Sequence, residues 1–199
     1  MARQIQFTET GGPEVLELVD VQPRDPGPGE IRIANRAVGL NFIDIYVRTG
    51  LYPAQPPSGL GTEGAGVVDA VGEGVEDFAE GDRVAYAQGP LGAYAEYITM
   101  DAEKAIALPE AIDFETAAAG MLKGLTVQYL LRQTYAIGED DTILFHAAAG
   151  GVGSIASQWA HALGAHVIGT VSNEDKAGIA KRNGAWMTID YTRESVPER

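Results

Sequence analysis

The 199-residue chain contains no cysteine. Disulfide bonds, thiolate metal sites and cysteine nucleophiles are therefore excluded from its chemistry. Its three histidines, His146, His161 and His166, do not have the spacing of metal ligands, and we expect capping or surface roles for them. The sequence accordingly predicts a protein without a metal site.

Basic residues and long apolar runs are also scarce. The 14 Lys and Arg residues face 28 Asp and Glu residues, which gives a net charge of −14. Such a chain repels nucleic acid and anionic lipid unless a local basic patch intervenes, and it has no run of Lys or Arg. No apolar run approaches the roughly 18–20 residues that span a bilayer, and Met1–Phe7 lacks the apolar region of a signal peptide. We expect a cytoplasmic protein that does not bind nucleic acid or insert into a membrane.

Short alternating segments separated by Gly and Pro turns fill the first part of the chain. The clearest is 30–38, where apolar and polar residues alternate as in a half-buried strand. Similar segments occur at 5–7, 15–21, 65–71, 82–87, 94–100 and 104–108, with a short helix expected at 39–48 and a loop at 51–61. Many short strands of this kind predict a barrel-like or sandwich domain.

The composition changes after Pro109. Residues 114–120 and 125–135 are rich in Ala and Leu and predict two helices, so a domain boundary is expected between Pro109 and Lys123.

The segment from Thr142 to Tyr191 is the part of the chain that points to a function. An apolar run at 142–147 predicts a strand, a glycine loop follows at 148–153, and apolar residues at helical spacing continue to Leu163. Gly164 stands where a helix C-cap requires a positive φ. A second strand is predicted at 166–171 and a third at 186–191.

This order of strand, glycine loop, helix and strand is typical of dinucleotide binding. The N–H groups and dipole at a helix N-terminus favour a pyrophosphate, and a Cβ at Gly150 or Gly151 would block its approach. Gly153 would let the helix pack closely on the strand, whereas Ala148 stands at the position of the usual first glycine. An ordinary strand-to-helix turn is the alternative interpretation.

Ordered motifs over the whole chain resemble one family, the zeta-crystallin-like quinone oxidoreductases of the medium-chain dehydrogenase/reductase superfamily. The matching motifs are Gly11–Leu16, Gly39–Asp44, Ser58–Glu63, Gly81–Val84, Lys123–Thr126 and Phe145–Gly153.

The resemblance implies an α/β protein with two domains. Residues 1–120 would form a GroES-like, β-rich domain that holds the substrate, and residues 121–199 the first half, βαβαβ, of a Rossmann doubly wound parallel sheet that binds NADP. The implied reaction is hydride transfer from NADPH to a small-molecule quinone. An enoyl or enone reductase of the same superfamily, or a non-catalytic crystallin-like protein, is the alternative.

The resemblance also implies a zinc-free enzyme. Zinc-bearing relatives place a Cys near Asn41 and a His where this chain has Thr62. A quinone accepts hydride without the Lewis acid that an alcohol dehydrogenase requires.

The family's cofactor contacts can be carried over to this chain by position. They fall on Asn41, Phe42, Ile43, Asp44, Ile45, Tyr46, Thr126, Tyr129, Gly150, Gly151, Val152, Ser172, Asn173, Glu174, Asp175, Lys176 and Tyr191. Tyr46 and Tyr52 are candidate catalytic residues, as hydrogen-bond donors or as walls for a flat quinone, or else partly buried aromatics at a domain edge. Asp44 is either a cofactor contact or a carboxylate favoured by the helix N-terminus.

The choice between NADPH and NADH depends on the end of the second strand. An NAD site places an acid there, whereas Thr170, Val171 and Ser172 are not acidic. Lys176 is a cation suited to a 2′-phosphate, which favours NADPH. Glu174 and Asp175 would repel that phosphate unless they serve only as first-turn acids behind an Asn173 cap.

The expected strands at 142–147, 166–171 and 186–191 are only strands 1, 2 and 3 of a fold whose order is 3-2-1-4-5-6. We therefore expect the chain to be a fragment that lacks roughly a hundred or more residues. Its strand at 142–147 would be an exposed apolar edge, and turnover by the fragment would be low or absent. The full-length protein is expected to be a homodimer.

Overall fold

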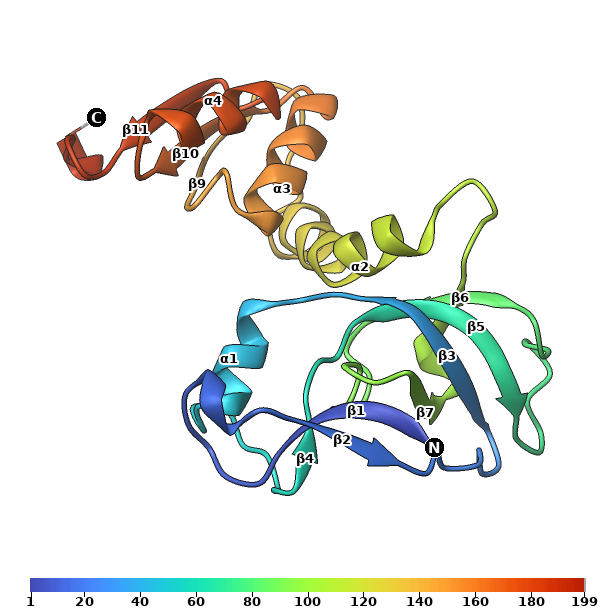
Figure 1. The fold of residues 1–199 in the computed structure, drawn as a ribbon. Coiled ribbons are helices and arrows are strands. Elements are labelled where there is room, and N and C mark those ends of the chain that lie inside the picture. The colour runs from blue at the N-terminus through green and yellow to red at the C-terminus, as the bar shows by residue number, and fades with distance from the viewer. Residues whose placement is uncertain (199) are drawn as a thin grey trace. The chain divides into compact units, whose positions relative to one another are not determined.

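The computed structural model describes residues 1–198 and divides the chain into two compact units, Met1–Leu122 and Lys123–Arg199. The first unit is built mainly of antiparallel strands, and the second of parallel strands joined by helices (Figure 1). This confirms the predicted fold class, a β-rich domain followed by the first half of a doubly wound sheet.

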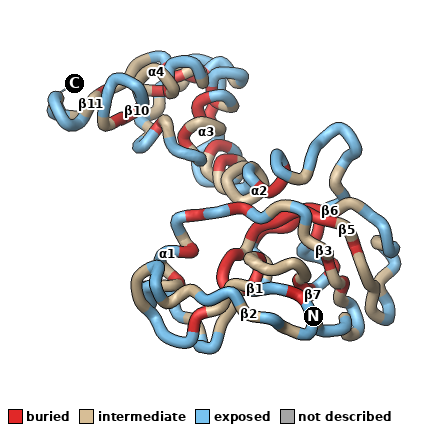
Figure 2. Tube along the Cα trace, viewed as in Figure 1, coloured by how far each residue is buried: buried red, intermediate tan, exposed pale blue. Residues whose placement is uncertain are grey.

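The largest sheet of the first unit has five antiparallel strands in the order β7-β3-β5-β6-β8. Their bounds are Tyr97–Asp101, Glu30–Val38, Gly64–Val71, Arg83–Tyr86 and Ala105–Ala107. Alternation in β3 places Ile31 and Ile33 fully inside, where they pack with Val68 of β5 and with Val84 and Tyr86 of β6. Figure 2 shows buried residues along β5 in this part of the unit.

A second sheet of the first unit has the order β2-β1-β4, with bounds Glu17–Val21, Ala2–Phe7 and Ser58–Gly59. Phe7 packs with Val47 of helix α1, Phe42–Arg48, and with Leu60. Two expectations were wrong here. Val15, expected to begin the second strand, instead ends a 3₁₀ turn, Pro13–Val15, and β2 begins at Glu17. The expected loop at 51–61 contains the short strand β4. A further 3₁₀ turn, Ala102–Lys104, precedes β8.

A single helix replaces the two helices predicted after Pro109. Helix α2 spans Phe114–Tyr129 and continues into a π-helical turn, Leu130–Thr134. Gly120 and Gly124 lie at the expected break, and each glycine costs a helix interior about 1 kcal/mol relative to alanine. Burial of Ala118 before them and Val127 after them favours a continuous helix instead.

The second unit is a three-stranded parallel sheet in the order β11-β10-β9. The strands are Met187–Asp190, His166–Val171 and Thr142–Phe145. Helix α3, Gly151–Ala162, connects β9 to β10, and helix α4, Glu174–Arg182, connects β10 to β11; a 3₁₀ turn, Val196–Glu198, follows. The core contains Val127 of α2, Ala156 and Ala160 of α3 and Val167 of β10. Gly164 has a φ of +82°, as its C-cap position predicted.

Within residues 1–198, β9 is an edge strand. Ile143 and Phe145 pack towards α3, whereas Leu144 points to the other face and is 49% exposed. An unpaired strand with an exposed apolar side chain is a site at which another segment can pair.

Across residues 1–198, every helix is too short or too polar to span a lipid bilayer.

Gly153→Ala is expected to destabilise the second unit. A Cβ at Gly153 would lie 2.5 Å from Ala147 O and 2.6 Å from Ala148 Cα, which are backbone atoms that cannot move aside cheaply. We expect a loss of about 1–3 kcal/mol in the free energy of unfolding, measured with urea. In the control Gly120→Ala the new methyl group meets nothing within 4 Å, so stability should be unchanged or slightly higher. Equal stabilities for the two variants would contradict the close packing of the loop on α3.

Candidate cofactor-binding site

The loop between β9 and α3 is tied to the end of β10. Ala147 has a φ of +52°, a left-handed conformation that a non-glycine residue seldom adopts. Its N–H donates to Thr170 Oγ1 at 3.2 Å, and the N–H of Ala148 donates to Thr170 O at 3.1 Å. The Thr170 hydroxyl also lies 3.1 Å from His146 Nδ1. These bonds stabilise a turn that would otherwise be strained.

The same loop places the N-terminus of α3. Gly150 is the N-cap, and the N–H of Ser154 is the first to bond back to it, at 2.8 Å. The N–H groups of the first helical residues therefore have no intrahelical acceptor and suit an anion. Gly153 packs closely, as predicted, although its near neighbours are the loop residues Ala147 and Ala148 rather than the strand.

A hollow of about 130 Å³ lies at the carboxyl ends of β10 and β11. It is lined by Ala147, Ala149, Gly150, Thr170, Val171, Ser172, Lys176 and Tyr191. Four of these, Gly150, Ser172, Lys176 and Tyr191, are among the predicted cofactor residues. The carboxyl edge of a parallel sheet is where ligands bind in such folds.

The first turn of α4 forms one side of this hollow. Asn173 caps the helix, because its Oδ1 accepts from the N–H of Lys176 at 2.9 Å. The Lys176 ammonium group donates to Ser172 Oγ at 3.0 Å, so Lys176 is directed towards the end of β10. Glu174 and Asp175 are exposed first-turn acids, and Glu174 pairs with Arg193.

The Asn41–Tyr46 group belongs to the first unit, whereas Thr126 and Tyr129 lie on α2 in the second. The N–H of Asn41 donates to Asp44 Oδ2 at 2.8 Å, and Tyr94 donates its hydroxyl to the same oxygen at 2.6 Å. Asp44 is buried, and its carboxylate caps the N-terminus of α1. This is the helix-terminal role expected from the sequence as the alternative to a cofactor contact. The other carboxylate oxygen of Asp44, Oδ1, is buried without a hydrogen-bond partner among residues 1–198.

The candidate catalytic tyrosines lie close together at α1. Tyr46 is half-buried, and its ring centroid is 5.4 Å from that of Tyr52 and 5.4 Å from that of Phe42. Tyr52 and Phe42 are exposed. The three rings form an aromatic surface within the first unit.

Three buried or half-buried polar residues, Glu63, Tyr94 and Thr170, had no role predicted from the sequence. Glu63 is fully buried and accepts from Asn41 Nδ2 at 2.5 Å and from the N–H of Leu122 at 2.7 Å. Burial, together with the bond to Asp44, raises the pKa of Tyr94, which therefore stays a hydroxyl donor. Thr170 is the third. Glu63 lies inside the motif Ser58–Glu63, but no local sequence pattern indicated a role for Tyr94 or Thr170.

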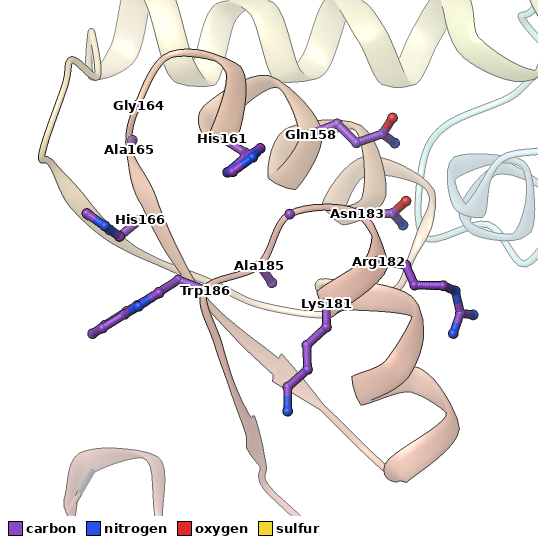
Figure 3. A pocket seen from close by; sticks show the side chains of 11 residues that line it. Gln158, His161, Gly164, Ala165, His166, Lys181, Arg182, Asn183, Ala185 and Trp186 are labelled. Atoms are coloured by element: carbon purple, nitrogen blue, oxygen red, sulfur yellow. The ribbon is translucent and has the colours of Figure 1, made fainter.

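A larger hollow, of about 610 Å³, lies at the opposite edge of the parallel sheet (Figure 3). Its lining includes His161 of α3, His166 at the start of β10, Lys181 and Arg182 at the end of α4, and Trp186 just before β11. None of the predicted cofactor residues borders it. Because ligands of such sheets bind at the carboxyl ends, its size does not make it the candidate site.

No cluster of three or more His, Asp or Glu side chains able to hold a metal ion is present within residues 1–198. Asn41 donates its side-chain amide to Glu63.

Two family models match separate parts of the chain. The alcohol dehydrogenase GroES-like domain matches residues 27–110, and the zinc-binding dehydrogenase model matches residues 151–199. A quinone oxidoreductase of Pseudomonas aeruginosa is 64% identical over the whole chain, and quinone oxidoreductase 1 of Escherichia coli is 57% identical. Over its whole length this chain is therefore similar to quinone oxidoreductases of the medium-chain dehydrogenase/reductase superfamily. It spans 62% and 61% of those two relatives, respectively.

Solved structures of such quinone oxidoreductases share the fold. One from Pseudomonas syringae has a TM-score of 0.99 at 61% identity, and covers 100% of this chain while this chain covers 62% of it. One from Escherichia coli, solved in complex with NADPH, has a TM-score of 0.98 at 57% identity, with coverages of 100% and 61%. A 2-haloacrylate reductase of Burkholderia is 45% identical over 94% of the chain and 58% of its own length.

Thr170→Val is expected to loosen the glycine loop. Valine keeps the shape of the side chain but leaves the N–H of Ala147 without its acceptor, at a cost of about 1–3 kcal/mol in the free energy of unfolding. In the control Thr188→Val, on β11, the hydroxyl removed makes no side-chain hydrogen bond within residues 1–198. Thermal unfolding of both variants measures the difference. If Thr170→Val is no less stable than Thr188→Val, the hydroxyl does not hold the loop.

Proposed function

We propose that the protein containing this chain transfers hydride from NADPH to a quinone without a bound zinc ion. The observation that carries this proposal is the hollow at the carboxyl ends of β10 and β11, where the glycine loop, Lys176 and Tyr191 meet. The likeness to quinone oxidoreductases, one of them solved with NADPH, supports it.

The residues present fit a dinucleotide. Gly150, Gly151 and Val152 at the N-terminus of α3 would bind the pyrophosphate through backbone N–H groups. Ser172, Asn173, Lys176 and Tyr191 would surround the adenosine ribose, with Glu174 and Asp175 at the rim of the same turn. Residues 121–199 thus carry the cofactor half of the proposed function, and residues 1–120 the substrate half.

The polar groups favour NADPH over NADH. No carboxylate stands at the end of β10 to accept from a ribose 2′-hydroxyl, because the residues there are Thr170, Val171 and Ser172. The Lys176 ammonium group is held beside the hollow by Ser172 and is placed to pair with a 2′-phosphate.

The nicotinamide ribose is proposed to be flanked by a segment of the first unit, Asn41, Phe42, Ile43, Asp44, Ile45 and Tyr46. Two residues of α2, Thr126 and Tyr129, are further proposed cofactor contacts. The unpartnered Asp44 Oδ1 supports the proposed ribose position, since a buried carboxylate oxygen is costly unless a donor such as a ribose hydroxyl reaches it. Tyr46 and Tyr52 would present flat rings and hydroxyl donors to a quinone.

Bound NADPH supplies the hydride, so the protein's own task is to position the quinone and stabilise negative charge on its oxygen. Hydrogen-bond donors suffice for that task, because a reduced quinone oxygen is a weaker base than an alkoxide. The proposed reaction therefore needs no zinc ion. Zinc-bearing relatives place a zinc ligand near the position of Asn41, whereas here the side-chain amide of Asn41 donates a hydrogen bond to Glu63. The proposal includes a homodimer, as the family resemblance implies, and a location in the cytoplasm, as the composition favours.

A second candidate is the reduction of an activated alkene. The 45% identity to a 2-haloacrylate reductase favours it. That reaction needs a proton donor for the α-carbon, and Tyr46 or Tyr52 would have to supply the proton.

Turnover assays on the natural full-length protein distinguish the two candidates. With 1,4-benzoquinone and 2-chloroacrylate as alternative acceptors, the proposal predicts NADPH oxidation at a kcat/KM at least about tenfold higher for the quinone. Addition of EDTA should leave the rate unchanged. A preference for 2-chloroacrylate would favour the second candidate, and loss of activity on chelation would contradict a zinc-free mechanism.

Lys176→Met is expected to weaken NADPH binding selectively. Removing the ammonium group while keeping most of the side chain should raise the Kd for NADPH about tenfold, the effect of one charge-assisted hydrogen bond, and leave the Kd for NADH unchanged. Quenching of cofactor fluorescence measures both constants. The control Lys181→Met changes a lysine of the same helix that borders the other hollow. Equal effects on the two cofactors would show that Lys176 does not contact the 2′-phosphate.

A further inference from the structure

One of the two acids in the first turn of α4, Glu174, has a cationic partner. Arg193 Nη1 lies 3.1 Å from Glu174 Oε1, and this pair joins the first turn of α4 to the turn after β11. Glu174 stands two residues before Lys176, which lines the hollow. An unpaired carboxylate there would repel a phosphate or accept from a ribose 2′-hydroxyl, as the acid of an NAD site does.

The turn after β11 holds the Arg193 backbone in place. The Thr192 hydroxyl donates to Asp190 Oδ1 at 2.7 Å, and the Thr192 N–H donates to the same oxygen at 3.0 Å. These bonds keep the pKa of Asp190 below its usual value, so Asp190 is a carboxylate at neutral pH. Its Oδ2 lies 3.9 Å from Arg193 Nε. The N–H of Arg193 donates to the Asp190 carbonyl at 2.9 Å. Arg193 thus follows by two residues Tyr191, which lines the hollow.

We infer that Arg193 is a positioning residue for cofactor selectivity: by engaging Glu174 it removes that carboxylate from the nucleotide site and so favours NADPH over NADH. This inference rests on the proposed function. Arg193 acts through Glu174, while Lys176 is the cation that faces the phosphate.

The solvent exposure of Arg193 and Glu174 limits how much their ion pair can change cofactor selectivity. The side chains of Arg193 and Glu174 are 68% and 86% exposed, so water and salt screen their charges. An exposed pair of this kind changes an equilibrium by up to about fivefold. The effect should therefore appear in cofactor selectivity rather than in stability.

The test is a double-mutant cycle with Arg193→Met, Glu174→Gln and the combined variant in the natural full-length protein. The readout is the ratio of the Kd for NADH to the Kd for NADPH, measured by cofactor fluorescence at about 50 mM salt, where screening is weak. We expect Arg193→Met to lower this ratio about fivefold and Glu174→Gln in the same chain to restore it. Arg182→Met, at the other end of α4, is the control and should not change the ratio.

Two results would overturn the inference. An unchanged ratio in Arg193→Met would mean that Glu174 does not affect the nucleotide. A ratio that stays low in the combined variant would mean that Arg193 contacts the phosphate itself rather than acting through Glu174. The proposed function fails separately, if the unaltered protein binds neither NADPH nor NADH.

Discussion

The candidate site depends on the hydrogen bonds between the end of β10 and the loop after β9. Thr170 accepts the N–H of Ala147 with its hydroxyl and the N–H of Ala148 with its carbonyl. Those bonds hold Ala147 in a left-handed conformation and turn the chain so that α3 begins at Gly151. Because one buried threonine links two parallel strands and a helix, the free N–H groups of α3 and the hollow beside Lys176 occupy one edge of the sheet.

The first unit contains a separate set of buried polar groups. Glu63 and Asp44 are carboxylates with almost no exposure, and each accepts hydrogen bonds from its surroundings. Burying a carboxylate is costly unless its oxygens are paired, so both residues constrain the start of α1. The aromatic rings on that helix are positioned as a consequence. An aromatic surface and a hydrogen-bonded anchor for its helix therefore come from one short segment of chain.

The sequence predicted those features that are specified locally. The bounds of β10 were predicted residue for residue, because a buried parallel strand is a continuous apolar run, and the Asn173 cap followed from its position before an acidic first turn. The break expected in α2 does not occur, because the local cost of Gly120 and Gly124 is outweighed by the tertiary burial of Ala118 and Val127, which the sequence alone does not reveal.

Features that depend on distant residues were not predictable in this way. The pairing of Glu174 with Arg193 spans 19 residues, and that of Asp44 with Tyr94 spans 50. No periodicity or spacing signals such contacts before the chain is folded. Four of the predicted cofactor residues of the second unit do line one hollow at the edge of its sheet, because each follows a strand or begins a helix: Gly150, Ser172, Lys176 and Tyr191. Thr126 and Tyr129, in contrast, lie in the last turns of α2. Those of the first unit were assigned by resemblance, and their role remains a proposal.

The most direct test of the central claim is a binding titration of the unaltered protein with NADPH and, separately, with NADH. Cofactor fluorescence gives both dissociation constants. We expect saturable binding of both nucleotides, with NADPH bound about tenfold or more tightly, since one charge-assisted hydrogen bond to the 2′-phosphate has that effect. Equal affinity, or tighter binding of NADH, would contradict the assignment of Lys176 to the phosphate, and binding of neither by a folded protein would contradict the cofactor site itself.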